Sequence, residues 1–478
     1  MTTKVKPMRN SNARTPRLLS LSVLALLAGC SMAPIYERPP APVAAQWPAS
    51  SADNTAATTA AADMAWQDFV GDARLRELVT LALDNNRDLR VALAAIEQAR
   101  AQYQIRRADQ LPTINAAVAG NRQPSSDGES ISSAYTAGLA MASWELDFFG
   151  RVASLKDAAL AQFLATQEAR NAVQTSLIAS VVSTWLSLQT NNELLALTQH
   201  TLATRQDSLR LNRMRFEQGV TSALDLRQAE SLTAAAQATL AQQRRLRALD
   251  VNALTQLVGQ PLPETLLAAP AIPAAQSLHD VPVGMPSDLL ERRPDIRQAE
   301  QQLIAANANI GAARAAFFPR IALTASAGTA SGALSGLFQS GAWGWTLAPQ
   351  AVLPIFDAGR NQAALESAQA GRDMALAQYE KAIQGAFREV ADALAGQATL
   401  GEQVRAQQAQ ADAEADRFRL ADLRYRNGVA SYLDVLDAQR ALFATQQALA
   451  QTQLAQQQNR VALYKALGGG WSAQAPQL

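Results

Sequence analysis

The chain has 478 residues, a net charge of +1, two histidines and a single cysteine. Its basic residues form no run beyond the N-terminus, which argues against nucleic acid as a partner. One cysteine allows no disulfide within the chain and makes a Cys/His metal site hard to assemble, and no pattern points to a cofactor. Aromatic residues make up only 5% of the chain, whereas Ala, Gln and Leu are abundant, which favours long helices over large globular cores.

The N-terminus has the layout of a bacterial secretion signal. Basic residues precede the apolar run "LLSLSVLALL" (18–27), which is too short to be a permanent membrane-spanning helix. Two small residues then lead to Cys30, where a lipobox would be cut and lipidated. We therefore expect a signal peptide over 1–29, a lipid on Cys30 and an extended N-terminal segment over 30–72; an ordinary signal peptide with a chance cysteine is the alternative. Ser31, in place of Asp, favours the outer membrane, and several acyl chains would give firm anchoring.

Most of the chain is a duplicated unit. The turn "FEQGVTSALDL" (216–226) returns as "YRNGVASYLDV" (425–435), and "DLR" (88–90) returns as "DIR" (295–297) in the same order. A single repetition at this long spacing indicates a duplicated domain and not a solenoid. We expect a first structural repeat over 73–259, a Pro-rich connector over 260–286, a second structural repeat over 287–467 and a C-terminal tail over 468–478.

Each copy contains one very long helical stretch. No proline interrupts residues 151–219 or 360–428. A continuous helix of this size would be about 100 Å long at 1.5 Å per residue, deeper than a small globular domain. In the second stretch apolar side chains recur every seven residues, which predicts paired, elongated coiled-coil helices. The residues on this register are Leu376, Ile383, Val390, Val404, Phe418 and Tyr425, with Gln397 and Ala411 interrupting it.

The repeated turn is predicted to be the bend of a helical hairpin. Its glycine can adopt the left-handed conformation that ends a helix. Its serine would cap the next helix, and the aspartate three residues later would complete a capping box and suit the positive end of the helix dipole. These residues are Gly219, Ser222 and Asp225 in the first copy and Gly428, Ser431 and Asp434 in the second.

Short extended segments separate the helices. Residues 113–122 and 134–144 flank one loop, residues 320–330 and 342–353 flank another, and each has about the length of a transmembrane β-strand. Aromatic residues gather near their ends, as interfacial aromatics do. Polar and apolar residues alternate only weakly, so two soluble hairpins packed on the helices are the alternative. Four strands cannot close a barrel, and lipid tolerates no open edge; two copies would supply eight strands and three would supply twelve.

The stretches "CSMAPIYERPPAPV" (30–43), "LLERRPDIRQAEQQLIAANANIGAARAAFFPRI" (289–321) and "YRNGVASYLDVLDAQR" (425–440) resemble the TolC-like outer-membrane efflux channels, in the lipoprotein branch of the OprM/NodT type. The resemblance runs from Cys30 to about Leu467. It implies a mainly α fold with a small transmembrane β part, and a homotrimer whose twelve-stranded β-barrel continues into a long periplasmic barrel of α-helices.

The resemblance also implies a location, partners and a cargo. The protein would lie in the outer membrane of a Gram-negative bacterium, with lipid around the barrel and most of its mass in the periplasm. A periplasmic adaptor and a proton-driven inner-membrane pump would be its partners. Drugs, metals or other small toxic compounds would be its cargo, and neither a cofactor nor an enzymatic activity is expected.

In this family the hairpin tips close the periplasmic mouth. By motif alignment, Tyr425, Asp434 and Asp437 match a tyrosine and two aspartates that constrict the channel of TolC. A spacing of three residues places both carboxylates near one face of a helix. The six carboxylates of a trimer would then favour cations.

One element of that gate is absent. Ala430 occupies the position of an arginine that helps to lock the TolC gate, and the candidates to replace it are Arg424, Arg426 and Leu433. An adaptor would be expected to dock at the two turns, on Gly219, Val220, Ser222, Asp225, Gly428, Val429 and Ser431.

The leading hypothesis is therefore a passive, gated exit duct for an energised efflux pump. A type I protein-secretion channel of the same fold is one alternative. A periplasmic adaptor or structural lipoprotein is another, although adaptors usually have a single helical hairpin. An enzyme is the least favoured, because His200 and His279 are without evident partners and each is expected to be a solvated side chain.

Overall fold

The computed structural model describes residues 32–44, 64–124, 131–268, 278–281 and 288–471, so Cys30 and its expected lipid lie outside the described residues. The chain forms two compact units, each assembled from separate stretches of sequence. The sheet unit combines Met1–Pro39, Glu97–Ala165 and Glu300–Gln378, and the hairpin unit combines Pro40–Ile96, Thr166–Ala299 and Tyr379–Leu478. Each unit thus takes a part of both copies of the sequence repeat.

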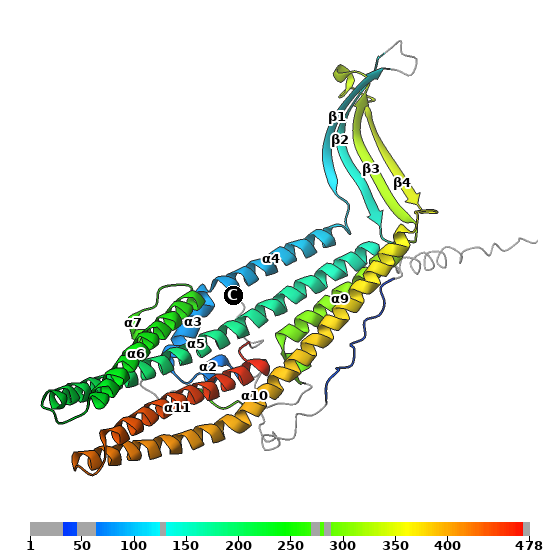
Figure 1. Ribbon diagram of the computed structural model, residues 1–478. Coiled ribbons are helices and arrows are strands. Elements are labelled where there is room, and N and C mark those ends of the chain that lie inside the picture. Colours follow the sequence, from blue (N-terminus) through cyan, green and yellow to red (C-terminus); the bar gives the residue numbers. More distant parts are fainter. Residues whose placement is uncertain (1–31, 45–63, 125–130, 269–277, 282–287, 472–478) are drawn as a thin grey trace, which may run out of the picture. The chain divides into compact units, whose positions relative to one another are not determined.

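The sheet unit contains four antiparallel strands in the order β1-β2-β3-β4 (Figure 1). The strands are β1 (Ile114–Pro124), β2 (Ile131–Leu146), β3 (Arg320–Ser331) and β4 (Trp343–Val352). All four extended segments predicted from the sequence are confirmed, with ends that differ by at most three residues. The outer strands β1 and β4 are exposed along their whole length.

A β-bulge interrupts β2 near its end. The pairing with β3 passes from Met141↔Ala325 to Trp144↔Leu323, and Ser143 has a positive φ of 40°. One extra residue therefore lies in β2 at this point, which reverses the side to which the following residues point.

In the sequence, each pair of strands lies between two helices. The helices α4 (Arg87–Ala108) and α9 (Pro294–Ala315) precede β1 and β3 in the chain. The long helices α5 (Arg151–Glu217) and α10 (Arg360–Arg426) follow β2 and β4, and each has 67 residues. The predicted order of helix, two strands and very long helix is therefore confirmed in both copies.

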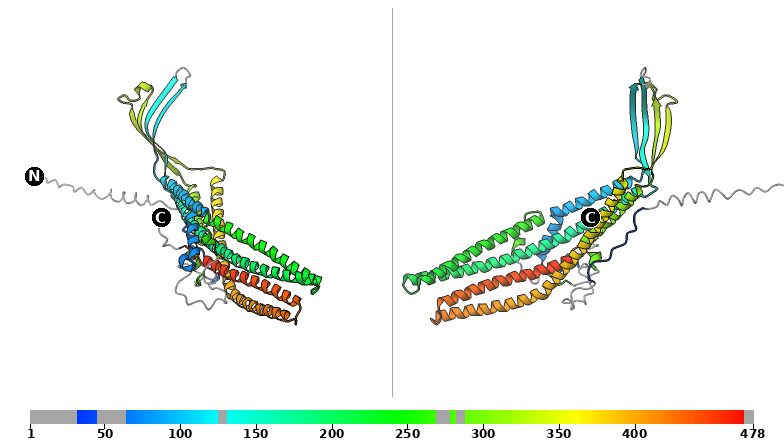
Figure 2. Two further views of the ribbon diagram at one scale, coloured as in Figure 1. Left: turned by 90° about the vertical axis from the view of Figure 1, so that its left-hand side faces the viewer. Right: turned by 45° about the vertical axis from the view of Figure 1, so that its right-hand side comes forward.

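The hairpin unit contains two long helical hairpins (Figures 1 and 2). The helix α5 turns into α6 (Ala223–Val258), and α10 turns into α11 (Tyr432–Ala466). The shorter helices are α2 (Trp66–Phe69), α3 (Ala73–Asn85), α7 (Glu264–Leu267) and α8 (Asp288–Arg292). Within the described residues, no helix combines the length and the apolar character needed to cross a membrane.

The seven-residue register of α10 is confirmed except at Gln397, which is exposed. Further along the helix, Val404, Phe418 and Tyr425 are half-buried and Ala411 is buried, whereas the residues next to them are mostly exposed. Ala411, which interrupts the apolar pattern in the sequence, is buried. A small side chain at such a position lets paired helices approach closely, so it continues the seam.

Candidate functional site

The strand register sorts the side chains of the sheet onto two faces, because cross-strand partners point to the same side. One face is apolar over most of its length and carries Ile114, Val118, Tyr135, Leu139, Met141, Trp144, Leu146, Ile321, Leu323, Trp343, Trp345 and Leu347. The other face carries Asn115, Asn121, Gln123, Thr136, Glu145, Arg320, Thr324, Ser326, Thr346 and Gln350.

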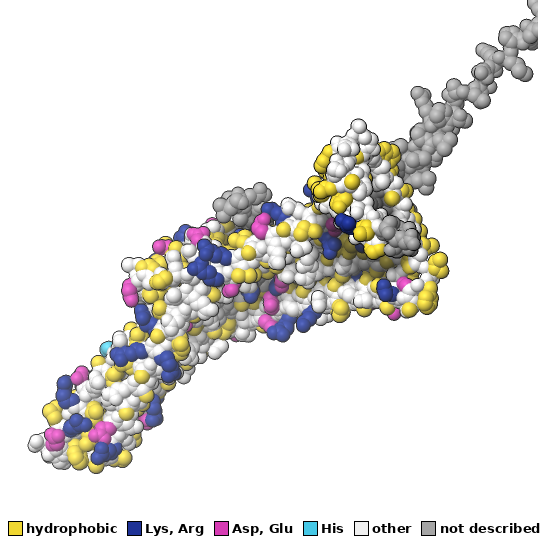
Figure 3. All heavy atoms as spheres, turned by 90° about the horizontal axis from the view of Figure 1, so that it is seen from above, with side chains coloured by type: hydrophobic (Ala, Val, Ile, Leu, Met, Phe, Trp, Pro, Cys, Tyr) yellow, Lys and Arg dark blue, Asp and Glu magenta, His cyan; other side chains and the backbone are white. Residues whose placement is uncertain are grey.

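The apolar face is uncovered. Trp343 and Trp345 are each 67% exposed and Val118 is 82% exposed. Figure 3 shows hydrophobic side chains with few charges over the sheet, whereas side chains of both charges mix over the helices. An exposed apolar surface of this extent marks a contact with another apolar phase or partner.

The bulge in β2 maintains the separation of the two faces. In an unbroken strand Trp144 and Leu146 would point to the polar face and Glu145 to the apolar one. Instead, Trp144 pairs with Leu323 on the apolar side. After the bulge the side chains of β2 alternate with the opposite register, which explains why the alternation of polar and apolar residues looked weak in the sequence.

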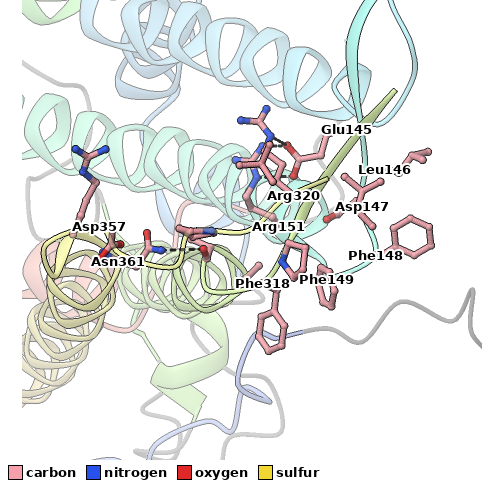
Figure 4. Close-up of a pocket in the computed structure, with 17 residues that line it drawn as sticks. Glu145, Leu146, Asp147, Phe148, Phe149, Arg151, Phe318, Arg320, Asp357 and Asn361 are labelled. Carbon is pink, nitrogen blue, oxygen red and sulfur yellow. Dashed lines mark hydrogen bonds and ion pairs between the residues drawn. The ribbon is translucent and has the colours of Figure 1, made fainter. Parts of the chain in front are cut away.

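Glu145 lies at the end of the sheet where β2 leads into α5, and it lines a pocket of about 350 Å³ (Figure 4). Its side chain is 9% exposed and accepts hydrogen bonds from Arg151 at 2.7 and 2.8 Å and from Arg320 Nε at 2.7 Å. The hydrogen bonds with Glu145 raise the pKa of Arg151. The carboxylate therefore ties the end of β2 to the start of α5 and to β3.

The first hairpin tip begins with a Schellman motif at the end of α5. Gly219 has a φ of 72° and donates from its N–H to the carbonyl of Phe216 at 2.9 Å, and Val220 donates to the carbonyl of Arg215 at 2.8 Å. Together these bonds satisfy two carbonyls that a helix end leaves unpaired. Val220 itself is 74% exposed.

The next residues form the predicted capping box. Ser222 Oγ accepts from the Asp225 N–H at 3.2 Å, and Asp225 Oδ2 accepts from the Ser222 N–H at 3.3 Å. Hydrogen bonds from the hydroxyls of Ser222 and Thr221 lower the pKa of Asp225. The carboxylate thus stays ionised at the start of α6, where the helix dipole favours a negative charge.

The second tip repeats this geometry. Gly428 has a φ of 73°, and Val429 donates to the carbonyl of Arg424 at 2.9 Å. Ser431 and Asp434 form the same capping box at the start of α11. The predicted turn conformation is therefore confirmed at both tips, and the difference is Ala430, which replaces Thr221 and its hydroxyl.

Tyr425 lies in a contact between the two hairpins. Arg215 of α5 donates a hydrogen bond to the Tyr425 hydroxyl, and its guanidinium carbon lies 5.4 Å from the centre of the ring. The ring of Tyr432, from α11, lies 5.3 Å from that of Tyr425. Sequence reasoning missed Arg215, because nothing in the local pattern shows which residue of the other hairpin faces the tyrosine.

The other predicted gate residues have partners close by in the sequence. Asp437 Oδ1 accepts from Arg440 at 2.7 Å, so its charge is balanced in part on its own helix. Arg426, a candidate lock, forms an ion pair with Asp422 at 2.8 Å on the same helix. Leu433 is 47% exposed and adds an apolar side chain to the second tip.

The two histidines differ. His200 is exposed, as expected. His279 is also exposed, but its ring Nδ1 lies 2.6 Å from the Asp68 carbonyl oxygen, so the prediction of a partnerless side chain is wrong there. Its backbone N–H also donates to the Phe69 carbonyl oxygen. The contact joins the segment 278–281 to α2 and gives the ring a structural role.

The chain resembles known proteins over almost its whole length. Residues 78–260 and 285–469 match the family model described as "Outer membrane efflux protein". The chain is 48% identical over 472 residues to the probable efflux pump outer membrane protein TtgC of Pseudomonas putida, covering 97% of each chain. It is 46% identical to the outer membrane protein OprJ of Pseudomonas aeruginosa, covering 95% of each.

A solved structure shows the same likeness. The crystal structure of the open state of the MtrE outer membrane channel of Neisseria gonorrhoeae superposes with a TM-score of 0.84 at 40% identity. The match covers 92% of this chain and 98% of MtrE.

Proposed function

The chain belongs to the outer membrane efflux protein family, and we propose that three copies of it form the outer-membrane exit duct of a tripartite efflux pump. The duct is passive: drugs or other small toxic compounds pass through it to the exterior, while an inner-membrane pump supplies the energy. The observation that carries this proposal is a four-stranded sheet with one apolar face, one polar face and two open edges.

Closure of the sheet requires more than one chain. The strands have 11, 16, 12 and 10 residues, and about 9–11 are enough to cross a bilayer when tilted. Lipid tolerates no unpaired strand edge, so β1 of one copy pairs with β4 of the next. Three copies give a twelve-stranded barrel, with the apolar face toward lipid and the polar face toward the lumen.

The helical hairpins continue the duct into the periplasm. We propose that each repeat, 73–259 and 287–467, contributes one β-hairpin and one helical hairpin to it. An adaptor protein docks at the tips, where Val220 and Val429 are exposed at the two turns. The Schellman and capping-box bonds hold both turns in one shape, which presents a preformed surface to the adaptor.

The tip of the second hairpin is the gate. Tyr425, Leu433, Asp434 and Asp437 narrow the mouth, and the carboxylates of three copies favour cations. Because Arg440 balances Asp437 in part, the preference is weaker than six free carboxylates would give. Ala430 has only a methyl group and cannot lock the gate as an arginine would. The contact of Arg215 with Tyr425 takes over this role.

Cys30 provides a second attachment to the membrane. We propose that the signal segment 1–29 is removed and that Cys30 is acylated. Several acyl chains give firm anchoring, and the barrel holds the trimer independently.

The test is the native mass of the protein extracted from membranes in mild detergent, together with its conductance in planar bilayers. We expect a complex of three chains, each with a mass increase at Cys30, that conducts ions. A stable, non-conducting monomer would refute the exit duct, because four strands with open edges cannot span lipid. A conducting trimer without any lipid mass would refute only the acylation.

A further inference from the structure

The two hairpins of one chain touch at a second point besides the contact of Arg215 with Tyr425. The helices α5 and α11 lie side by side (Figure 1), and the guanidinium carbon of Arg205, on α5, lies 5.3 Å from the centre of the Phe443 ring, on α11. Arg205 precedes Arg215 by ten residues, which is about 15 Å along a helix at 1.5 Å per residue. We call the contact surface between α5 and the second hairpin the seam, and Arg205 lies within it.

Arg205 is buried without a negative partner. Its exposed fraction is only 5%. A guanidinium carries five N–H donors. Here one nitrogen donates to the carbonyl of Leu232, on α6, at 2.9 Å, while Nε is buried and has no partner. Burial lowers the pKa of Arg205, and among the described residues no carboxylate offsets this effect.

One other arginine is buried in the part of the chain that the structure describes, and its charge is paired. Arg293 lies 2.7 Å from a carboxylate oxygen of Asp295 and 2.8 Å from one of Glu389. Burial alone would lower the pKa of Arg293, but these two carboxylates raise it. A buried charge without such partners costs free energy because it has lost its water. At Arg205 this cost is not offset by a carboxylate.

Separation of the two hairpins would remove that cost. The hydrogen bond to Leu232 lies within the first hairpin and survives when the hairpins part. Only the contact with Phe443 crosses the seam, and it would be lost. Water would then reach the guanidinium, including the unpartnered Nε. A cation–π contact is worth less than the hydration that a buried charge loses, so Arg205 destabilises the closed seam.

The second copy of the repeat has a different pair of residues at these positions. Alignment of the two turns places Arg205 on Glu414 and Phe443 on Ala234. Glu414 has a partner on its own helix, Arg417, at 3.1 Å. In the proposed ring these counterparts would lie between the second hairpin and the next copy. The buried, unpaired cation is therefore a feature of the seam within one chain.

We propose that Arg205 favours opening of the duct, because its buried and unpaired charge destabilises the contact between the two hairpins that Arg215 and Tyr425 maintain near the tips. The inference rests on the exit duct proposed above. It adds a residue whose effect on the gate has the opposite sign to that of Arg215. The closed state is then easier to open than the contact near the tips alone would allow, and a smaller difference in adaptor affinity is enough to shift it.

The test is the single-channel conductance of the full-length protein in planar bilayers. Arg205→Met removes the charge and keeps a long, unbranched side chain that packs well against an aromatic ring. We expect the fraction of time spent open to fall about tenfold. Loss of a merely supporting contact would raise it. Arg205→Gln, which is also neutral and keeps a donor for the Leu232 carbonyl, should change the open fraction in the same direction. The yield of heat-stable trimers on gels shows that each variant folds and assembles.

The effect is largest where the duct is often open. Adding Arg205→Met to Arg215→Ala should return the open fraction toward that of the wild type, because changes about 15 Å apart are nearly additive. Arg205→Lys keeps a positive charge in the seam and should open at least as often as the wild type. Arg210→Met is the matched control: Arg210 is exposed on the same helix, pairs with Asp207 at 2.8 Å, and should not affect the open fraction.

Each of three results would overturn the inference. An Arg205→Met channel that opens as often as the wild type, or more often, would show that Arg205 does not oppose closure. Equal closing in Arg205→Lys would show that the shape of the side chain decides and not its charge. Both results leave the exit duct standing. A wild-type trimer that never conducts would refute the exit duct, and the inference with it.

Discussion

Replacing Arg215 with alanine is expected to release the gate, because this residue connects the two hairpins of one chain. An exposed cation–π contact contributes about 0.5–1 kcal/mol, and a net hydrogen bond about 0.5–1.5 kcal/mol. The two contacts use the same guanidinium, so their contributions cannot be added in full. We expect the closed state to lose about 1–2 kcal/mol of stability per chain. That is about a 5- to 30-fold shift toward the open state for one chain.

In a trimer whose tips open together the three losses combine to about 3–6 kcal/mol, or about 10²- to 10⁴-fold. The assay is single-channel conductance in planar bilayers, where Arg215→Ala should spend much more time in high-conductance states. Arg213→Ala is the matched control: Arg213 lies on the same helix, but its ion pair, at 3.6 Å, is with Glu230 of the same hairpin. Wild-type conductance in Arg215→Ala, or equal opening in Arg213→Ala, would refute the lock.

Three further changes have defined outcomes. Replacing both Asp434 and Asp437 with alanine should lower cation selectivity and weaken block by multivalent cations in planar bilayers; unchanged reversal potentials would remove both from the gate. Gly138→Val should abolish heat-stable trimers on gels, because an added Cβ would lie 2.4 Å from the Ala327 carbonyl oxygen across the sheet, and normal trimer yield would contradict this packing. Asp225 should stabilise its tip above the ordinary aspartate pKa and lose that effect only as the pH falls through its lowered pKa; the protection of amides at the start of α6, measured against their intrinsic exchange rate at each pH, should therefore fall in acid, and it should be low at every pH in Asp225→Ala. Protection at the wild-type tip that does not change in acid would contradict the role of the charge.

The helices and turns could be predicted because their causes are local. A proline-free stretch with a seven-residue repeat is enough to indicate a long paired helix. Gly219 and Ser222 act on neighbours within three or four residues, so the sequence contains the whole motif. The same holds for the second copy, whose turn repeats the geometry of the first.

The faces of the sheet could not be predicted from alternation alone. Small residues occupy many alternate positions, which weakens the contrast between faces. The bulge between Met141 and Trp144 then reverses the phase within one strand. Only the pairing with β3 shows that Trp144 shares a face with Leu323, and pairing depends on residues far away in the chain.

The missed side-chain partners have the same physical origin. Tyr425 was singled out from its motif, but its partner Arg215 lies on another hairpin. Glu300 looks in the sequence like any polar residue of a helix. Its burial and its bond to Arg38 follow from an arm that approaches from the N-terminus, which no local pattern reveals.

The duplication shows which contacts belong to one copy only, because each residue of the second copy can be compared with its counterpart in the first. Tyr425 corresponds to Phe216, which has no hydroxyl, so Arg424, the counterpart of Arg215, cannot make the same hydrogen bond in return. In the proposed ring, where first and second hairpins alternate, the bond to Tyr425 therefore forms on one side of each second hairpin only. Breaking it separates the two hairpins of one chain on this side while the capping bonds keep both turns intact, so opening of the duct is expected to begin between these two hairpins.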